Sequence, residues 1–117
     1  MFAQPLNLKT PGGLVSLESN LMLAPIAGWC ELAWRVGVRE LNAIGGQTVG
    51  GVGLACTDLL NPQGLLCDEG AARDLARTND LDQPIGMQLY GADPKHLAEG
   101  ARWCAEHGAH VVDINMG

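Results

Sequence analysis

The sequence predicts an α/β fold in which helices cover a parallel β-sheet. Four short, mostly unalternating apolar runs, typical of strands buried on both faces, are separated by segments with helical periodicity. The starts of these runs are spaced by at most about thirty residues, the length of one strand–helix–strand unit. With 47% hydrophobic and 17% charged residues, the chain of 117 residues has the composition of one globular domain.

The first twenty residues form a polar lead-in that precedes the alternating pattern. Within it, Pro11-Gly12-Gly13 is typical of a turn and predicts a short hairpin-like start. We therefore divide the chain into a lead-in, residues 1–20, and a body, residues 21–117. The strands expected in the body lie at residues 21–24, 52–56, 85–89 and 110–114.

Helices fill the gaps between these strands, and we expect them at residues 31–43, 69–78 and 94–107. The third is the clearest, because Asp93 can cap it and Pro94 suits its first position. Asp68 is the expected cap of the second, and residues 45–53 form a glycine-rich loop. The side chains expected to face the sheet are Leu32, Val36 and Leu41, then Ala72, Leu75 and Ala76, then Leu97, Ala101 and Cys104.

This alternation allows two architectures, an open doubly wound sheet or a barrel, and four strands with three helices would make half of an eight-stranded barrel. In both, ligands gather at the carboxyl ends of the strands. Residues 25–28, 57–58, 88–91 and 115–117 stand there and offer exposed backbone, amides or a carboxylate. Such groups suit the mixed donor and acceptor edge of a flat heteroaromatic ring, and a flavin has such an edge.

Charge and cysteine content narrow the function classes. The formal net charge of -6 provides no basic surface for nucleic acid within this segment. No CxxC pair, targeting signal or membrane-length apolar stretch is present, which favours a reduced, cytoplasmic setting. The histidines form no ligand cluster, so we expect no metal site. The cysteines are Cys30, Cys56, Cys67 and Cys104.

Four motifs stand at the expected strand ends: Leu23-Ala24-Pro25-Ile26-Ala27-Gly28, Thr57-Asp58, Gln88-Leu89-Tyr90-Gly91-Ala92-Asp93-Pro94 and Asp113-Ile114-Asn115-Met116-Gly117. In order and spacing they resemble the first four strand ends of tRNA-dihydrouridine synthases. The resemblance implies a (β/α)8 TIM barrel with FMN at its mouth, followed by a small helical domain that helps to grip tRNA. Residues 21–117 would be the amino-terminal half of that barrel, its first four strands and three helices.

The resemblance also implies roles for particular residues. Pro25, Ile26 and Ala27 would contact FMN, Gln88 would hydrogen-bond the isoalloxazine, and Asn115 would meet the target uridine or flanking tRNA. Reduced FMN, recharged by NADPH, passes a hydride to C6 of uracil while a cysteine protonates C5. That cysteine would follow Gly117, so the resemblance places no catalytic residue in this chain. We expect the isolated chain to be inactive and to self-associate, with tRNA bound mainly by other regions.

Other interpretations stay open at this point. Gln88 could serve only a neighbouring backbone group, Asn115 could be a turn residue, and Asp113 is expected to be structural and to need a partner. The family more often has glutamate where Asp58 stands and threonine where Cys30 stands, so these roles, and that of Thr57, are undecided.

The competing functions are a dihydroorotate-dehydrogenase-like FMN barrel and a non-catalytic half-barrel that pairs with another half or a second copy. A dinucleotide-binding module is a weak alternative, because the glycines at residues 51–53 open a strand rather than follow one.

Overall fold

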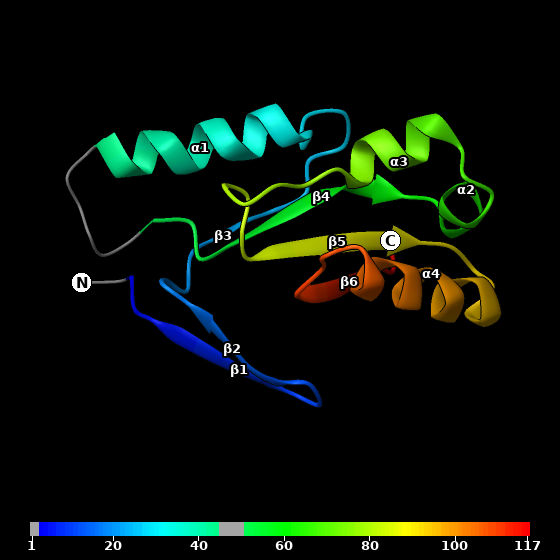
Figure 1. Cartoon of the computed structure of the whole chain (residues 1–117), viewed down its shortest axis with the longest axis horizontal. Helices are drawn as coiled ribbons and strands as arrows, with labels where there is room; N and C mark the ends of the chain where they lie inside the picture. Colours follow the sequence, from blue (N-terminus) through cyan, green and yellow to red (C-terminus); the bar gives the residue numbers. More distant parts are fainter. Residues whose placement is uncertain (1–2, 45–50) are drawn as a thin grey trace.

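The computed structural model describes residues 3–44 and 51–117, so residues 45–50 of the expected loop lie outside the described part. The elements follow in the order β1, β2, β3, α1, β4, α2, α3, β5, α4 and β6 (Figure 1). The fold is mixed α/β, as predicted. None of the described helices is long and apolar enough to cross a membrane.

The lead-in is an antiparallel hairpin of β1 (Leu6–Thr10) and β2 (Gly13–Leu17). The Thr10 hydroxyl donates to the Gly13 carbonyl at 2.8 Å, and Gly13 adopts a φ of 126°, a region that favours glycine. This confirms the predicted turn. The hairpin extends away from the main sheet (Figure 1).

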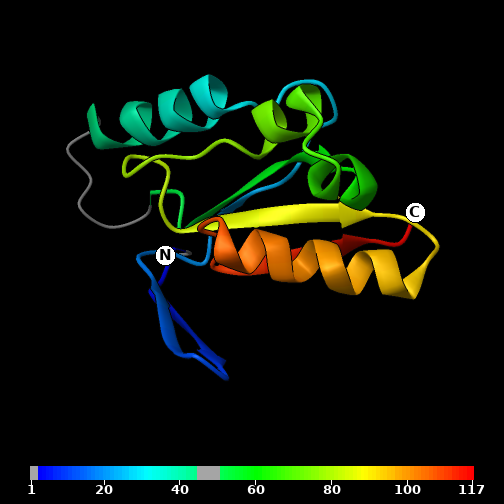
Figure 2. The same ribbon diagram turned by 45° about the vertical axis from the view of Figure 1, so that its right-hand side comes forward.

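The main sheet is parallel throughout and has the order β3-β4-β5-β6. Its strands are β3 (Met22–Leu23), β4 (Leu54–Leu60), β5 (Ile85–Tyr90) and β6 (Val111–Asn115). This sheet, with its helices, is compatible with part of an α/β barrel. The carboxyl ends of β5 and β6 and the chain terminus lie at the same end of the molecule (Figure 2).

Three strand predictions need correction. β3 is shorter than expected, and the outer strands β3 and β6 are not buried on both faces, since Met22 is 53% exposed and Ile114 is 39% exposed. β4 begins and ends later than expected, so Thr57 and Asp58 lie within the strand and not beyond its end. The polar pair resembled a strand terminus, but hydrogen bonds described below satisfy it inside the sheet.

The helices are α1 (Leu32–Ile44), α2 (Pro62–Leu66), α3 (Gly70–Ala76) and α4 (Pro94–Glu106). Asp93 caps α4 as predicted, because its carboxylate accepts the Lys95 backbone N–H at 2.9 Å. The sequence analysis missed α2. Its signal was Asn61 followed by Pro62, an N-cap residue before a proline at the first helical position.

Asp68 is not the cap of α3. The N-cap is Glu69, which makes no side-chain capping bond, while Asp68 has a φ of 60° and pairs with Arg73 at 2.8 Å. Leu41 was also wrongly placed in the apolar stripe of α1, since it is 70% exposed. Arg35 is buried on that helix instead.

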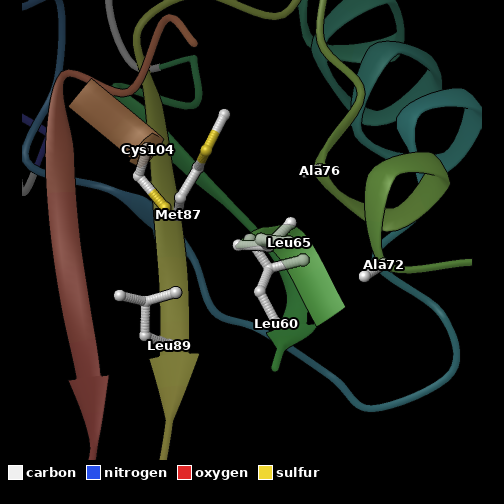
Figure 3. Close-up of a cluster of buried hydrophobic side chains, with 7 residues drawn as sticks. All are labelled: Leu60, Leu65, Ala72, Ala76, Met87, Leu89 and Cys104. Atoms are coloured by element: carbon white, nitrogen blue, oxygen red, sulfur yellow. The ribbon is translucent and has the colours of Figure 1, made fainter. Parts of the chain in front are cut away.

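The core lies between β4, β5 and the helices α2, α3 and α4 (Figure 3). Met87 and Leu89 of β5 are fully buried there, and Cys104 of α4 packs against them as predicted. Because side chains alternate along a strand, Gly86 and Gln88 lie on the opposite face of β5. The core members are Leu60, Leu65, Ala72, Ala76, Met87, Leu89 and Cys104.

Candidate functional site

An irregularity in β4 brings polar groups to the carboxyl half of the sheet. Cys56 pairs with Gly86 and Leu59 with Gln88, so β4 carries one extra residue between these pairs. The Thr57 hydroxyl, fully buried, accepts the Gln88 backbone N–H at 3.2 Å. The hydroxyl thus supplies an acceptor for Gln88 where the register of the ladder shifts.

The next residue, Asp58, reaches across to the loop that follows β3. Its carboxylate, 5% exposed, accepts the Gly28 backbone N–H at 2.5 Å and the Leu59 backbone N–H at 2.7 Å. Gly28 has a φ of 80°, which glycine adopts without strain. Asp58 therefore anchors the loop of residues 25–28 to β4, a role that the sequence left undecided.

The same loop has its own internal bonds. The Ile26 backbone N–H donates to the Cys30 sulfur at 3.0 Å, and the Trp29 backbone N–H donates to the Ile26 carbonyl at 3.0 Å. Ile26 and Ala27 are exposed and Pro25 is half-buried. Within the described residues the Ala27 backbone N–H donates to no acceptor, so it can donate to a ligand.

On the other side of β4, the amide of Gln88 joins two polar residues of β6. Its Nε2 donates to the carboxylate of Asp113, and its Oε1 accepts the Asn115 Nδ2 at 3.3 Å. Gln88 is 7% exposed, whereas Asn115 is exposed and uses its Oδ1 to accept the Gly117 backbone N–H at 2.8 Å. Asp113 thus has the partner that its place in a strand demanded.

These contacts make a continuous row from β3 to β6. Gln88 and Asn115 are in direct contact. The loop that carries Pro25, Ile26 and Ala27 is connected to them through β4, by way of Asp58 and Thr57. The predicted site residues therefore lie along one edge of the sheet, although the contacts described do not join the loop to Gln88 directly.

The Cys56 thiol of β4, next to Thr57 in the strand, is not a reactive nucleophile. Burial, reinforced by the negative charge of Asp113, raises the pKa of the Cys56 thiol to about 11, so the thiol stays protonated at neutral pH. Within residues 3–44 and 51–117, no three His, Cys, Asp or Glu side chains form a group that could hold a metal ion.

The sequence analysis missed a buried ion pair between Arg35 of α1 and Asp82, which precedes β5. A signal was present, because Arg35 falls three residues after Leu32 and next to Val36, on the predicted apolar face of the helix. A charged residue in that position needs a buried partner.

Comparisons with known proteins agree on one family. The sequence model of the dihydrouridine synthase (Dus) family matches residues 22–117. The tRNA-dihydrouridine synthase B of Xanthomonas axonopodis pv. citri is 32% identical over 107 residues, which are 90% of this chain and 29% of that protein. The protein of the same name from Escherichia coli K12 is 32% identical over 109 residues, covering 90% of this chain and 30% of its own.

A probable tRNA-dihydrouridine synthase of Rhizobium leguminosarum bv. phaseoli is 30% identical over 108 residues, covering 88% of this chain and 29% of that protein. The chain spans less than a third of the length of these curated relatives.

Proposed function

Because the chain belongs to the dihydrouridine synthase family, we propose that residues 21–117 form the first part of an FMN-binding (β/α)8 barrel in a tRNA-dihydrouridine synthase. The complete enzyme would reduce uridine in tRNA to 5,6-dihydrouridine in the cytoplasm, with NADPH as reductant. The parallel order β3-β4-β5-β6, with helices packed on one face, supports the barrel.

The observation that carries this proposal is the amide of Gln88, held between Asp113 and Asn115 at the carboxyl end of the sheet. An amide has two N–H groups and an oxygen with two lone pairs. Gln88 uses one of each within the protein, so a second donor and a second acceptor are left for a ring edge. This pairing fits the isoalloxazine of FMN, which has donors and acceptors side by side.

The loop after β3 suits the same cofactor. The Ala27 backbone N–H can donate to a carbonyl oxygen, while Ile26, 49% exposed, and Pro25 offer apolar surface to a flat ring. When bound, reduced FMN supplies the hydride for the reaction. The protein's own contribution would be to hold the ring edge at Gln88 and to orient the uracil through Asn115, whose amide keeps one free N–H.

tRNA would be held mainly by regions of the complete enzyme other than this segment. The chain has a net charge of -6, and such a surface field repels a polyanion. We propose that only a local contact, at Asn115, comes from this segment. The isolated chain would then be inactive, because it spans less than a third of its relatives' length.

A segment exchange tests the cofactor assignment. Residues 22–117 would replace the matching segment of the Escherichia coli relative, and bound FMN and dihydrouridine in tRNA would be measured. We expect the exchanged enzyme to retain FMN and activity. Gln88→Ala should weaken FMN binding by about five- to tenfold, since one lost hydrogen bond is worth about 1 kcal/mol.

Gln63→Ala is the matched control, because Gln63 is an exposed glutamine on α2 and is not a hydrogen-bond partner of Gln88, Asp113 or Asn115. Equal FMN affinity in the two variants would show that Gln88 does not hold the ring. A folded exchange enzyme without flavin, beside a parent that retains it, would contradict the FMN proposal for this segment.

We further propose that the isolated chain self-associates. Leu21 and Met22, at the β3 edge, are 47% and 53% exposed, and Ile114 on β6 is 39% exposed. Apolar side chains on open strands favour pairing with a second copy. Sedimentation across a range of concentrations measures this, and a monomer at every concentration would contradict it.

A further inference from the structure

A buried ion pair lies behind the loop of residues 25–28. The side chains of Arg35 and Asp82 are both 0% exposed. Nε and Nη2 of Arg35 lie 2.9 Å and 2.8 Å from the same oxygen of Asp82, Oδ2, and Nε of Arg39 lies 3.5 Å from the other oxygen, Oδ1. Removing two charges from water is costly, and apolar residues of similar volume often give equal stability. Stability alone therefore does not account for the pair.

Two further guanidinium N–H groups donate to backbone carbonyls. Nη1 donates to the Cys30 carbonyl, and Nη2 donates to the Arg77 carbonyl at 2.6 Å. Asp82 is oriented in turn, because the Thr78 hydroxyl donates to its carboxylate at 3.2 Å. Arg35 thus connects the start of α1 to the segment that leads into β5.

Cys30 passes this constraint to the loop. It is 0% exposed, its sulfur accepts the Ile26 backbone N–H at 3.0 Å, and its S–H donates to the Ala24 carbonyl, with 3.5 Å between sulfur and oxygen. The loop is then fixed at two points, Ile26 through Cys30 and Gly28 through Asp58. Ala27, the residue with the available N–H, lies between them.

We propose that Arg35, aligned by Asp82, is a positioning residue that acts through Cys30 to hold residues 25–28 in the shape that receives the ligand. This rests on the proposed function only where it identifies that ligand as FMN. The guanidinium makes a charge-assisted bond to the Cys30 carbonyl, and such bonds are stronger than neutral ones. The thiol then sets the direction of the Ile26 N–H.

An isosteric pair of variants tests the link without touching the buried charges. Valine and threonine have nearly the same shape, but only threonine can accept a hydrogen bond at the position of the sulfur. In the full chain, amide hydrogen exchange followed by NMR should show the Ile26 amide at least about tenfold less protected in Cys30→Val than in Cys30→Thr. The Gln88 amide, bonded to Thr57, is the internal reference.

Arg35→Lys probes the preceding link. Lysine keeps the charge beside Asp82, but its one nitrogen has to replace the three nitrogens with which Arg35 reaches Asp82, the Cys30 carbonyl and the Arg77 carbonyl, so it cannot keep all of these bonds in the same geometry. We expect it to lower Ile26 protection as Cys30→Val does, with the Gln88 amide unchanged. If Arg35→Lys does not fold, the two Cys30 variants still decide the matter.

Titration of the same samples with FMN, followed by amide shifts, separates this inference from the proposed function. Weaker FMN binding in Cys30→Val than in Cys30→Thr, together with lost Ile26 protection, supports both. Equal Ile26 protection in the two variants overturns the inference, even where Gln88→Ala weakens FMN binding. If protection differs but Gln88→Ala leaves the FMN affinity of the exchanged enzyme unchanged, the positioning role stands and the flavin assignment fails.

Discussion

The two faces of β5 differ in the kind of side chain that they carry and in its partners. Met87 and Leu89 are fully buried among helices and have apolar partners. Gln88, between them in sequence, faces the other way and is bonded to Asp113 and Asn115. One strand thus specifies the fold with one set of side chains and builds the candidate site with the other. The two sets can be tested separately.

Leu89→Ala should give the largest effect, because it empties part of the helix-covered face. Truncation of a fully buried leucine costs about 2–5 kcal/mol in unfolding free energy, through lost burial and the cavity that remains. Urea denaturation followed by circular dichroism measures this. Leu66→Ala on α2, 41% exposed, is the control and should change stability by at most about 0.5 kcal/mol. Equal losses would contradict the buried core as described.

The two faces each hold a buried thiol, and pH distinguishes their surroundings. Burial raises the pKa of Cys104, on the helix side, and of Cys56, on the polar side, from 9.0 to about 11. Below pH 9, the contribution of each protonated thiol to the unfolding free energy is fully present. As pH rises toward 11 the unfolded thiol ionises first, so the contribution, about 3 kcal/mol for two pKa units, is lost. In Cys56→Ala and Cys104→Ala, the unfolding free energy should therefore fall less steeply between pH 9 and pH 11 than in the unchanged chain.

Asp113→Asn sharpens this contrast. The negative charge of Asp113 raises the pKa of Cys56 but does not contribute to the raised pKa of Cys104. We therefore expect the variant to lower the pKa of Cys56 alone, measured by absorbance of the thiolate in Cys56→Ala and Cys104→Ala backgrounds. An equal shift in the pKa of both thiols would mean that Asp113 does not act on the polar face of β5 alone.

Gly86→Ala tests how closely the polar face of β5 is packed near the start of the strand. An added Cβ would lie 2.8 Å from the Cys56 sulfur, so the variant should lose about 1–3 kcal/mol of unfolding free energy. In a Cys56→Ala background the space is free, and the same change should stabilise by about 0.4–1 kcal/mol through the unfolded chain. A double-mutant cycle measures this reversal of sign; its absence would contradict the close contact.

Sequence reasoning succeeded where a residue's environment is local or periodic. Asp93-Pro94 carried its own capping geometry, and the unalternating run around Met87 identified a strand in a parallel sheet. It failed where a side-chain pairing or an unusual backbone conformation decides. Asp68 resembles a cap, but its pairing with Arg73 and its φ of 60° place it before the helix.

The candidate site shows the same limit. The residues of the row could be listed from strand ends, and the need of Asp113 for a partner was predicted. The extra residue in β4 could not be predicted, because it arises from the register between β4 and β5. The pairing of Arg35 with Asp82 joins positions 47 residues apart, and no single-segment pattern specifies such a contact.

Gln88→Ala should cost far less stability than truncation of its buried neighbours on β5, and this makes it the strictest test of the two-face comparison. The change leaves Asp113 and Asn115 without the amide, but Asn115 is exposed and Asp113 half-buried, so water can replace the lost bonds. We expect a cost of about 1 kcal/mol in urea denaturation, well below that of Leu89→Ala one residue away. A loss as large as that of Leu89→Ala would mean that Gln88 serves the fold, and its assignment to the site would have to be withdrawn.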